Sequence, residues 1–193
     1  MLKMACKLCQ EKPVWKFTNQ QQLCSKCFVK YFENKIKKTI RKYNMPINTI
    51  NKNNLKAKFC DAKNKNNLKA KFCDAKNKNN LKAKVINSIL KEIPKRKGKV
   101  REDSLDDISI SILYIVMYGN IDNLKKIIPK NQPLYFLSEK EILLYAKIKK
   151  IKGKLEENKN KRAKEISNFI KIIEQKNPDI RQNVVGALLK NLF

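Results

Sequence analysis

Four cysteines near the N-terminus have the spacing of a metal site. They form two C-x2-C pairs, Cys6/Cys9 and Cys24/Cys27, with 14 residues between the pairs. Each pair forms a tight turn, and two such turns complete a tetrahedral shell of four thiolates. We predict that these cysteines bind a structural metal ion. Zinc is the first choice, because so short a module cannot fold on its own core. A rubredoxin-like iron site and four unligated thiols are the alternatives.

Other kinds of catalytic chemistry lack their usual residues. The sequence has no histidine, which excludes histidine-based acid–base and triad chemistry. Its four glycines, Gly98, Gly119, Gly153 and Gly186, are far apart, so no glycine-rich loop for a phosphate can form.

Two further pairs of residues have simpler explanations than a site. Cys60 and Cys73 occupy identical positions of a tandem repeat, so one duplication explains both, and no further ligands remain to complete a second metal site. Asp106 and Asp107 form a carboxylate pair, but acids are also favoured at the start of a helix by its dipole.

The charge of the chain is high and uneven. Its net charge is +28, and residues 1–100 carry 27 basic and 5 acidic residues against 18 and 12 in residues 101–193. A/T-rich coding would by itself enrich Lys, Asn and Ile, so part of the excess needs no partner. The asymmetry nevertheless predicts a polyanionic partner, most simply a nucleic acid, bound by the first half.

A basic helix is predicted directly after the second cysteine pair, over residues 27–43. Phe28, Phe32, Ile36 and Ile40 recur every four residues as one apolar stripe. The basic residues could be no more than the solvated face of a packed helix, but the metal site would orient this helix rigidly. Five of them are therefore candidate nucleic-acid contacts: Lys30, Lys37, Lys38, Arg41 and Lys42.

The predicted fold is mainly α, in three parts. Residues 1–45 form a zinc-knuckle hairpin, with an extended run at 14–18, and the basic helix. Residues 46–103 form a linker that contains the 13-residue repeat, NKNNLKAKFCDAK, present twice and then truncated at 51–84. Its leucines do not fall on one helical face, so we expect an irregular linker, followed by a short helix over 85–97.

Residues 104–193 are predicted to form a helical bundle. Capping boxes mark helix starts at Ser104 and Ser138, and helices are expected over 104–118, 121–128, 138–148, 155–175 and 180–192. The first is apolar almost all round, so we expect it to be central and packed against 138–148 and 180–192. Residues 134–136 are expected to be extended. The apolar run at 108–119 is too short to span a membrane.

Several segments resemble one enzyme family. The stretch CKLCQEKPVWKFTNQQQLCSKCFVKYFENKIKKTIRKY resembles the zinc finger and first helix of the TtuA-type tRNA 2-thiolation family, which belongs to the PP-loop ATP pyrophosphatases. SLDDISISILYIVMYGN, QPLYFLSEKEILLYAKIKKI and RAKEISNFIKIIEQKNPDIRQNVV resemble later segments of that family, in the same order. The resemblance implies tRNA as partner, with ATP and an iron–sulfur cluster or catalytic cysteines as reaction components.

The departures from the family concern its catalytic core. The family's S-G-G-x-D-S nucleotide loop is missing, and the repeat begins where that core should start. Glu102 and Asp103 fill the Gly and His positions before the L-D-D segment. The internal C-x-x-C and the third, later cysteine are also missing, so neither ATP nor an iron–sulfur cluster is supported here. The C-terminal helices are therefore expected to be the remnant of an α/β fold.

Three functions follow as hypotheses. The first is a cytoplasmic, zinc-dependent tRNA-binding protein that is catalytically defective on its own and works with a catalytic or sulfur-carrier partner. The second is an active tRNA 2-sulfurtransferase whose partner supplies the ATP and sulfur chemistry. The third is a degenerate gene product without a selected role. Whether the chain is an enzyme is left open by the sequence, and a membrane is not expected as a partner.

Overall fold

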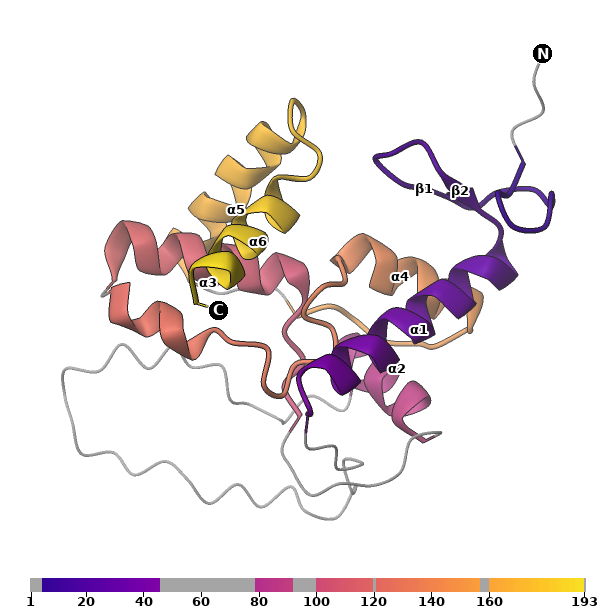
Figure 1. Ribbon diagram of the computed structural model, residues 1–193, viewed down its shortest axis with the longest axis horizontal. Coiled ribbons are helices and arrows are strands. Elements are labelled where there is room, and N and C mark those ends of the chain that lie inside the picture. The colour runs from indigo at the N-terminus through magenta and orange to yellow at the C-terminus, as the bar shows by residue number, and fades with distance from the viewer. Residues whose placement is uncertain (1–4, 46–78, 92–99, 120, 157–159, 193) are drawn as a thin grey trace.

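The computed structural model describes residues 5–45, 79–91, 100–119, 121–156 and 160–192. These residues are mainly helical, with one small antiparallel hairpin near the N-terminus, which confirms the predicted class (Figure 1). The first two repeat copies, with Cys60 and Cys73, lie outside the described residues. The elements are β1 Trp15–Lys16, β2 Gln22–Leu23, α1 Ser25–Lys42, α2 Leu81–Leu90, α3 Leu105–Tyr118, the 3-10 helix η1 Ile121–Lys126, α4 Glu139–Ile148, α5 Lys161–Glu174 and α6 Ile180–Leu192.

The hairpin and α1 form a head that is built on aromatic rings. Trp15 of β1 pairs with Leu23 of β2, and the turn between them passes through Gln20 at a positive φ of 66°. The ring of Trp15 lies 5.5 Å from that of Phe28 on α1. The predicted apolar stripe of α1 is buried, and Phe32 stacks at 4.3 Å on Tyr145 of α4. The stripe therefore ties the head to the rest of the chain.

The truncated third copy of the repeat is part of the folded structure. Asn80 caps α2 by accepting a hydrogen bond from the Ala83 N–H, and Leu81 is buried. The Leu81 N–H donates to the carbonyl of Lys154, and a Cβ added at Gly153 would lie 2.9 Å from the Leu81 Cα. The helix thus begins at Leu81 and not at Val85, because a cap and a tertiary contact outweigh the weak helix propensity of the Asn-rich segment.

Two hydrophobic cores divide the described residues. The first contains the head together with α2 and α4, and the second contains parts of α3 and α6 (Figure 1). The segment before α4 contributes side chains to both cores: Leu134 and Leu137 to the first and Tyr135 to the second. Residues 134–136 form a turn rather than the expected extended run. A turn lets neighbouring side chains face different cores.

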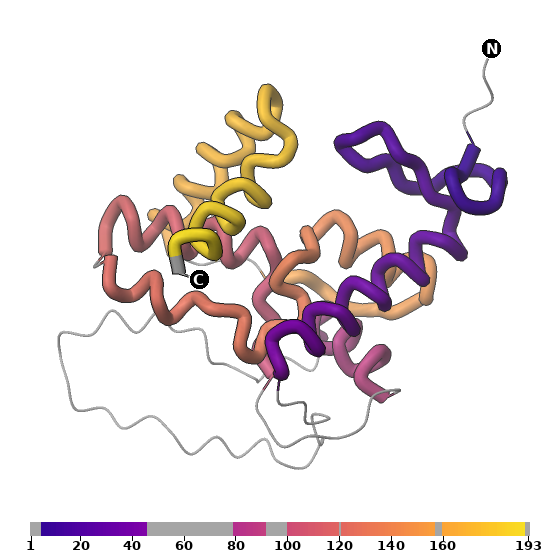
Figure 2. Tube along the Cα trace, viewed as in Figure 1, coloured from indigo at the N-terminus to yellow at the C-terminus, as the bar shows by residue number. Residues whose placement is uncertain are grey.

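The C-terminal bundle differs from its prediction in two respects. Both capping boxes are present, Ser104 with Asp107 and Ser138 with Glu141, and α3 packs against α6 as expected. However, α4 packs mainly on α1 and α2, while α5 and α6 form a hairpin of helices over α3 (Figure 2). The last turn of α3 is also more exposed than expected, with Val116 and Met117 each 54% exposed. No described helix has the length and apolar character needed to cross a membrane.

Candidate metal centre and basic helix

The four cysteines of the head meet at one point. The sulfur atoms of Cys6, Cys9, Cys24 and Cys27 all lie within 4.8 Å of one another. The Sγ atom of Cys9 is 3.3 Å from that of Cys24 and 3.6 Å from that of Cys27. No other cluster of this kind occurs among the residues that the structure describes.

Local backbone geometry explains how each pair of cysteines converges. The Gln10 N–H donates to the carbonyl of Cys6, which closes the first turn, and Gln10 adopts a positive φ of 63°. The second pair begins α1, with Cys24 as the N-cap residue, and its side chain makes no capping hydrogen bond. Its sulfur is therefore available as a ligand, and the helix N-terminus favours thiolates at this position.

The acidities of the thiols differ strongly within the cluster. Burial disfavours ionisation of Cys6, but hydrogen bonds from the backbone of Cys24, Leu8 and Cys9 outweigh it and lower its pKa to about 6. By contrast, a hydrogen bond with Cys9, followed by burial, raises the pKa of Cys27 to about 12. Four thiols this close cannot all ionise without a cation between them.

The donor set fits a single metal ion. With metal–sulfur bonds of about 2.3 Å, sulfurs at the corners of a tetrahedron are about 3.8 Å apart, close to the separations seen here. A cubane of four irons and four sulfides holds its cysteine ligands farther apart than one ion does. A divalent ion would also let the protonated thiols of the cluster ionise and act as ligands. Four protein ligands leave no open coordination position, so the site is suited to a structural role.

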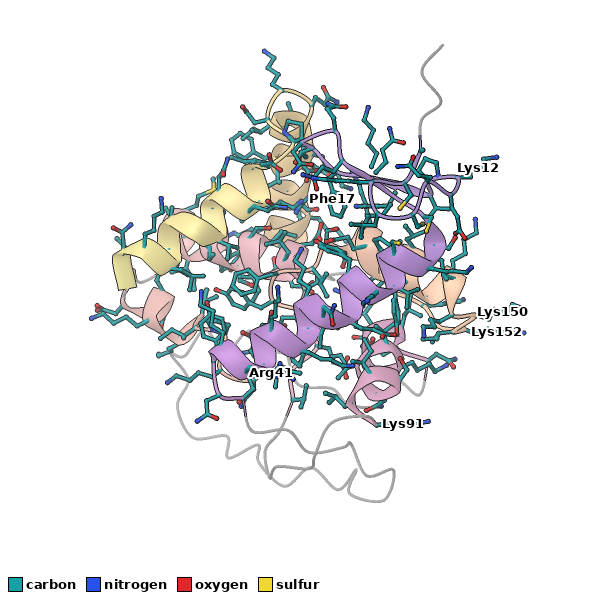
Figure 3. All side chains as sticks on the ribbon, turned by 45° about the vertical axis from the view of Figure 1, so that its right-hand side comes forward. Lys12, Phe17, Arg41, Lys91, Lys150 and Lys152 are labelled. Carbon is teal, nitrogen blue, oxygen red and sulfur yellow. The ribbon has the colours of Figure 1, made fainter. Side chains whose placement is uncertain are left out.

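The five predicted nucleic-acid contacts do not share one face of α1. At about 100° per residue, Lys30, Lys37 and Arg41 fall within about 40° of one another. We call these three residues the outer stripe; Arg41 lies near the C-terminal end of the helix (Figure 3). Lys38 and Lys42 lie about a quarter of a turn around the helix axis from the outer stripe. Both line a cleft that residues of the hairpin and of α6 also line.

Other basic residues were not among the predicted contacts. Lys7 and Lys35 line the same cleft as Lys38 and Lys42. Figure 3 also shows Lys12, Lys91, Lys150 and Lys152 pointing outward along one edge of the molecule. These residues come from separate segments of the chain, so no local sequence pattern connects them.

A second polar cluster surrounds Lys82, from the third repeat copy. The Nζ atom of this buried lysine donates to Asp107, to Glu139 at 2.7 Å and to the Ser104 hydroxyl at 3.1 Å. Burial by itself would lower the pKa of Lys82, but the charges of Asp107 and Glu139 outweigh it and raise the pKa. This cluster joins α2 to the starts of α3 and α4.

The carboxylate pair of α3 is fully used by the fold. Asp107 completes the capping box and pairs with Lys82, while Asp106 accepts a hydrogen bond from the Glu139 N–H and pairs with Arg181 at 3.3 Å. Burial is the main cause that raises the pKa of Asp106. These contacts support the interpretation of the pair as a helix start and not as an acid–base pair.

Comparison with known proteins gives a likeness in fold. No protein-family model matches the sequence, and the curated proteins contain no significant match to it. Among solved structures, the U34-tRNA thiolase NcsA from Methanococcus maripaludis, with its [4Fe-4S] cluster, is similar at a TM-score of 0.68 and 13% sequence identity. The match covers 100% of this chain and 88% of that chain. The chain therefore has a fold like that of this tRNA thiolase.

Proposed function

We propose that this chain is a cytoplasmic tRNA-binding protein related to tRNA 2-thiolation enzymes, with zinc at the four cysteines. The observation that carries the proposal is that the outer stripe lies on a helix that begins at the four-cysteine cluster. Cys24 and Cys27 belong to the first turn of α1, so a bound ion would fix the direction of the whole helix. Lys30 and Arg41 are exposed along it.

The spacing of the outer stripe suits a nucleic-acid backbone. Its residues recur at intervals of seven and four, which spreads three cations along one side of an 18-residue helix. Phosphate contacts of this kind contribute most of the affinity and little of the sequence preference. The fold likeness to a U34-tRNA thiolase supports tRNA as the nucleic acid that we propose.

We further propose that the chain does not adenylate tRNA by itself. Holding ATP and its magnesium in line with a target oxygen requires a phosphate-binding loop, and the four separated glycines do not supply one. In this view the chain derives from a PP-loop enzyme without its nucleotide-binding core, and a partner protein supplies any ATP and sulfur chemistry. ATP–pyrophosphate exchange by the pure protein would refute this part of the proposal.

Fluorescence anisotropy with labelled tRNA tests the binding proposal. We expect wild-type protein to bind with an affinity that falls steeply as salt rises. Changing Lys30, Lys37 and Arg41 together to Gln should reduce the slope of log affinity against log salt by about 1 for each phosphate that the variant no longer neutralises. The matched control changes three exposed lysines of α5, Lys161, Lys164 and Lys171, to Gln. An equal reduction in both variants, or salt-insensitive binding, would contradict a role for the outer stripe.

The identity of the metal is a separate question with its own measurement. Elemental analysis of the purified protein should give one zinc for each chain. Iron in place of zinc would indicate the rubredoxin-like alternative.

A further inference from the structure

A cleft separates the head from the C-terminal bundle. Its volume is about 940 Å³, and it is bounded by the hairpin, by one side of α1 and by α6. The hairpin and α6 stand on its opposite sides (Figure 1). Small-molecule sites usually occupy ~300–1,000 Å³, so this cleft is at the upper end of that range.

The charged side chains of the cleft have a single sign. Four lysines line it, Lys7, Lys35, Lys38 and Lys42, and the described lining residues include no Asp or Glu. Lys35 is compensated from outside the cleft by Glu141, at 3.3 Å. None of the ion pairs found between described residues involves the other three lysines. Lys7, Lys38 and Lys42 thus have no carboxylate partner among the described residues. Their positive charge makes the cleft attractive to an anion.

Aromatic rings and amides accompany these lysines. Phe17 of the hairpin, Tyr31 of α1 and Phe136 before α4 line the cleft, and all three are only partly buried. The rings of Phe17 and Tyr31 meet edge to face at 5.0 Å, an arrangement that does not cover the face of both rings. The Lys35 ammonium lies 5.2 Å from the centre of the Tyr31 ring, and Phe136 stacks on Tyr43 at 6.0 Å, so Phe17 is the ring on which we expect a base to stack. Amide side chains line the same space, from Asn19, Gln21 and Gln182.

We propose that this cleft binds unpaired nucleotides of an RNA. Lysines would contact the phosphates, partly exposed rings would stack on bases, and the amides would donate to and accept from base edges, as in known single-strand sites. A duplex cannot present its base faces to such rings. An acidic peptide could satisfy the lysines, but it would leave the rings without a stacking partner. The inference rests on the proposed RNA-binding function and assigns it a second, distinct contact surface.

Gly186 offers a way to fill the cleft without replacing any of its lysines, rings or amides. It lies on α6 and lines the cleft, and a Cβ added there meets nothing within 4 Å. Gly186→Phe should fill part of the space, while Gly186→Ala adds only a methyl group and improves helix propensity. The two variants share the same backbone change and differ in the volume that they place in the cleft.

The experiment measures anisotropy of a labelled short oligouridylate and of a labelled RNA duplex of the same length. We expect Gly186→Phe to bind oligouridylate at least about tenfold more weakly than Gly186→Ala does. Neither variant should alter duplex binding. A second variant, Phe17→Leu, leaves Gly186 in place. It keeps an apolar side chain against Tyr31 but removes the ring, so it should weaken oligouridylate binding.

The outcomes separate this inference from the proposed function. If wild-type protein binds tRNA and Gly186→Phe and Phe17→Leu both bind oligouridylate as tightly as wild type, the cleft is not the nucleotide site and the outer stripe stands. If wild-type protein binds no RNA, both proposals fail. If polyglutamate displaces oligouridylate from wild-type protein and binds it more tightly, the cleft is an acidic-peptide site and the inference is wrong.

Discussion

The cysteine cluster of the head and the charged cluster around Lys82 both bring polar groups of distant segments together, but they are completed differently. Four thiols meet in the head without a cationic side chain among them, and only a cation from outside the chain can neutralise their thiolates. Around Lys82 the chain supplies both signs of charge itself. The stability of the head should therefore depend on metal, whereas that of the Lys82 cluster should depend on its own side chains.

Metal removal should give the largest effect, confined to the head. The sequence contains one tryptophan, Trp15, whose ring packs on Phe28 beside the cysteines. Chelation at neutral pH should shift Trp15 fluorescence to the red, because the head loses the ion that holds its two cysteine pairs together. Far-UV circular dichroism should keep most of its helical signal. An unchanged emission spectrum after complete metal removal would show that the head folds without an ion.

Replacing the buried lysine should give the next largest effect. Lys82→Met leaves Asp107 and Glu139 without their cation, which should lower the free energy of unfolding by about 3 kcal/mol. Urea denaturation followed by circular dichroism measures this change. Lys84→Met is the matched control, since Lys84 comes from the same repeat copy and its ammonium donates to the Lys152 carbonyl at the surface and to no carboxylate of the described residues. This substitution should cost less than ~1 kcal/mol. Equal effects of the two substitutions would contradict the buried role of Lys82.

The two capping boxes differ in whether the serine also contacts Lys82, and removing each serine should change stability by a smaller amount than replacing Lys82. Ser138→Ala should cost about 1 kcal/mol, the usual value for losing an N-cap. Ser104→Ala should cost more, because the Ser104 hydroxyl also accepts a hydrogen bond from Lys82 at 3.1 Å. Thermal or urea unfolding of both variants measures the difference. If Ser138→Ala proves the more damaging change, the Lys82 contact contributes nothing.

Mild acid should slightly stabilise the C-terminal part of the chain, residues 100–192, which we call the tail. This is the smallest of the expected effects, and mild acid should destabilise the head. Burial is the main cause that raises the pKa values of Glu102, Asp103 and Asp106. A carboxyl with a raised folded pKa adds stability that is complete below its unfolded pKa and is lost as the pH rises through its folded value. Lowering the pH from 7 toward the raised pKa values of these three carboxyls should thus slightly stabilise the tail. In the head, the same change should protonate the cysteines and weaken their hold on a metal ion.

Paired measurements over this pH range test the difference. Trp15 fluorescence follows the head, and urea unfolding by circular dichroism follows the tail. A tail that loses stability between pH 7 and pH 5 would contradict the assignment of these three raised pKa values.

The two clusters also show which features the sequence could predict. Cys6, Cys9, Cys24 and Cys27 form a site through two short turns, so their spacing alone revealed it. The stripe of α1 and both capping boxes are local patterns as well, and they were found for the same reason. Lys82 lies 25 residues from Asp107 and 57 from Glu139, and nothing in its repeat copy distinguishes it from the equivalent lysines of the other copies.

Long-range packing accounts for the other differences from prediction. The placement of α4 on α1 and α2 depends on the stacking of Tyr145 with Phe32, more than a hundred residues away in the chain. The cleft lined by Lys38 and Lys42 depends on where α6 lies relative to the hairpin. Periodicity places residues on a helix face, but it does not determine which neighbour that face meets.

We propose that the head binds tRNA only when a metal ion holds its four cysteines together. The most direct test of this dependence removes zinc from the protein stepwise with a chelator while the anisotropy of labelled tRNA is recorded. We predict that tRNA affinity falls in proportion to the zinc removed and returns when zinc is added back, with the helical signal of the tail largely unchanged. Full-strength tRNA binding by the metal-free protein would show that the head binds tRNA without a metal ion.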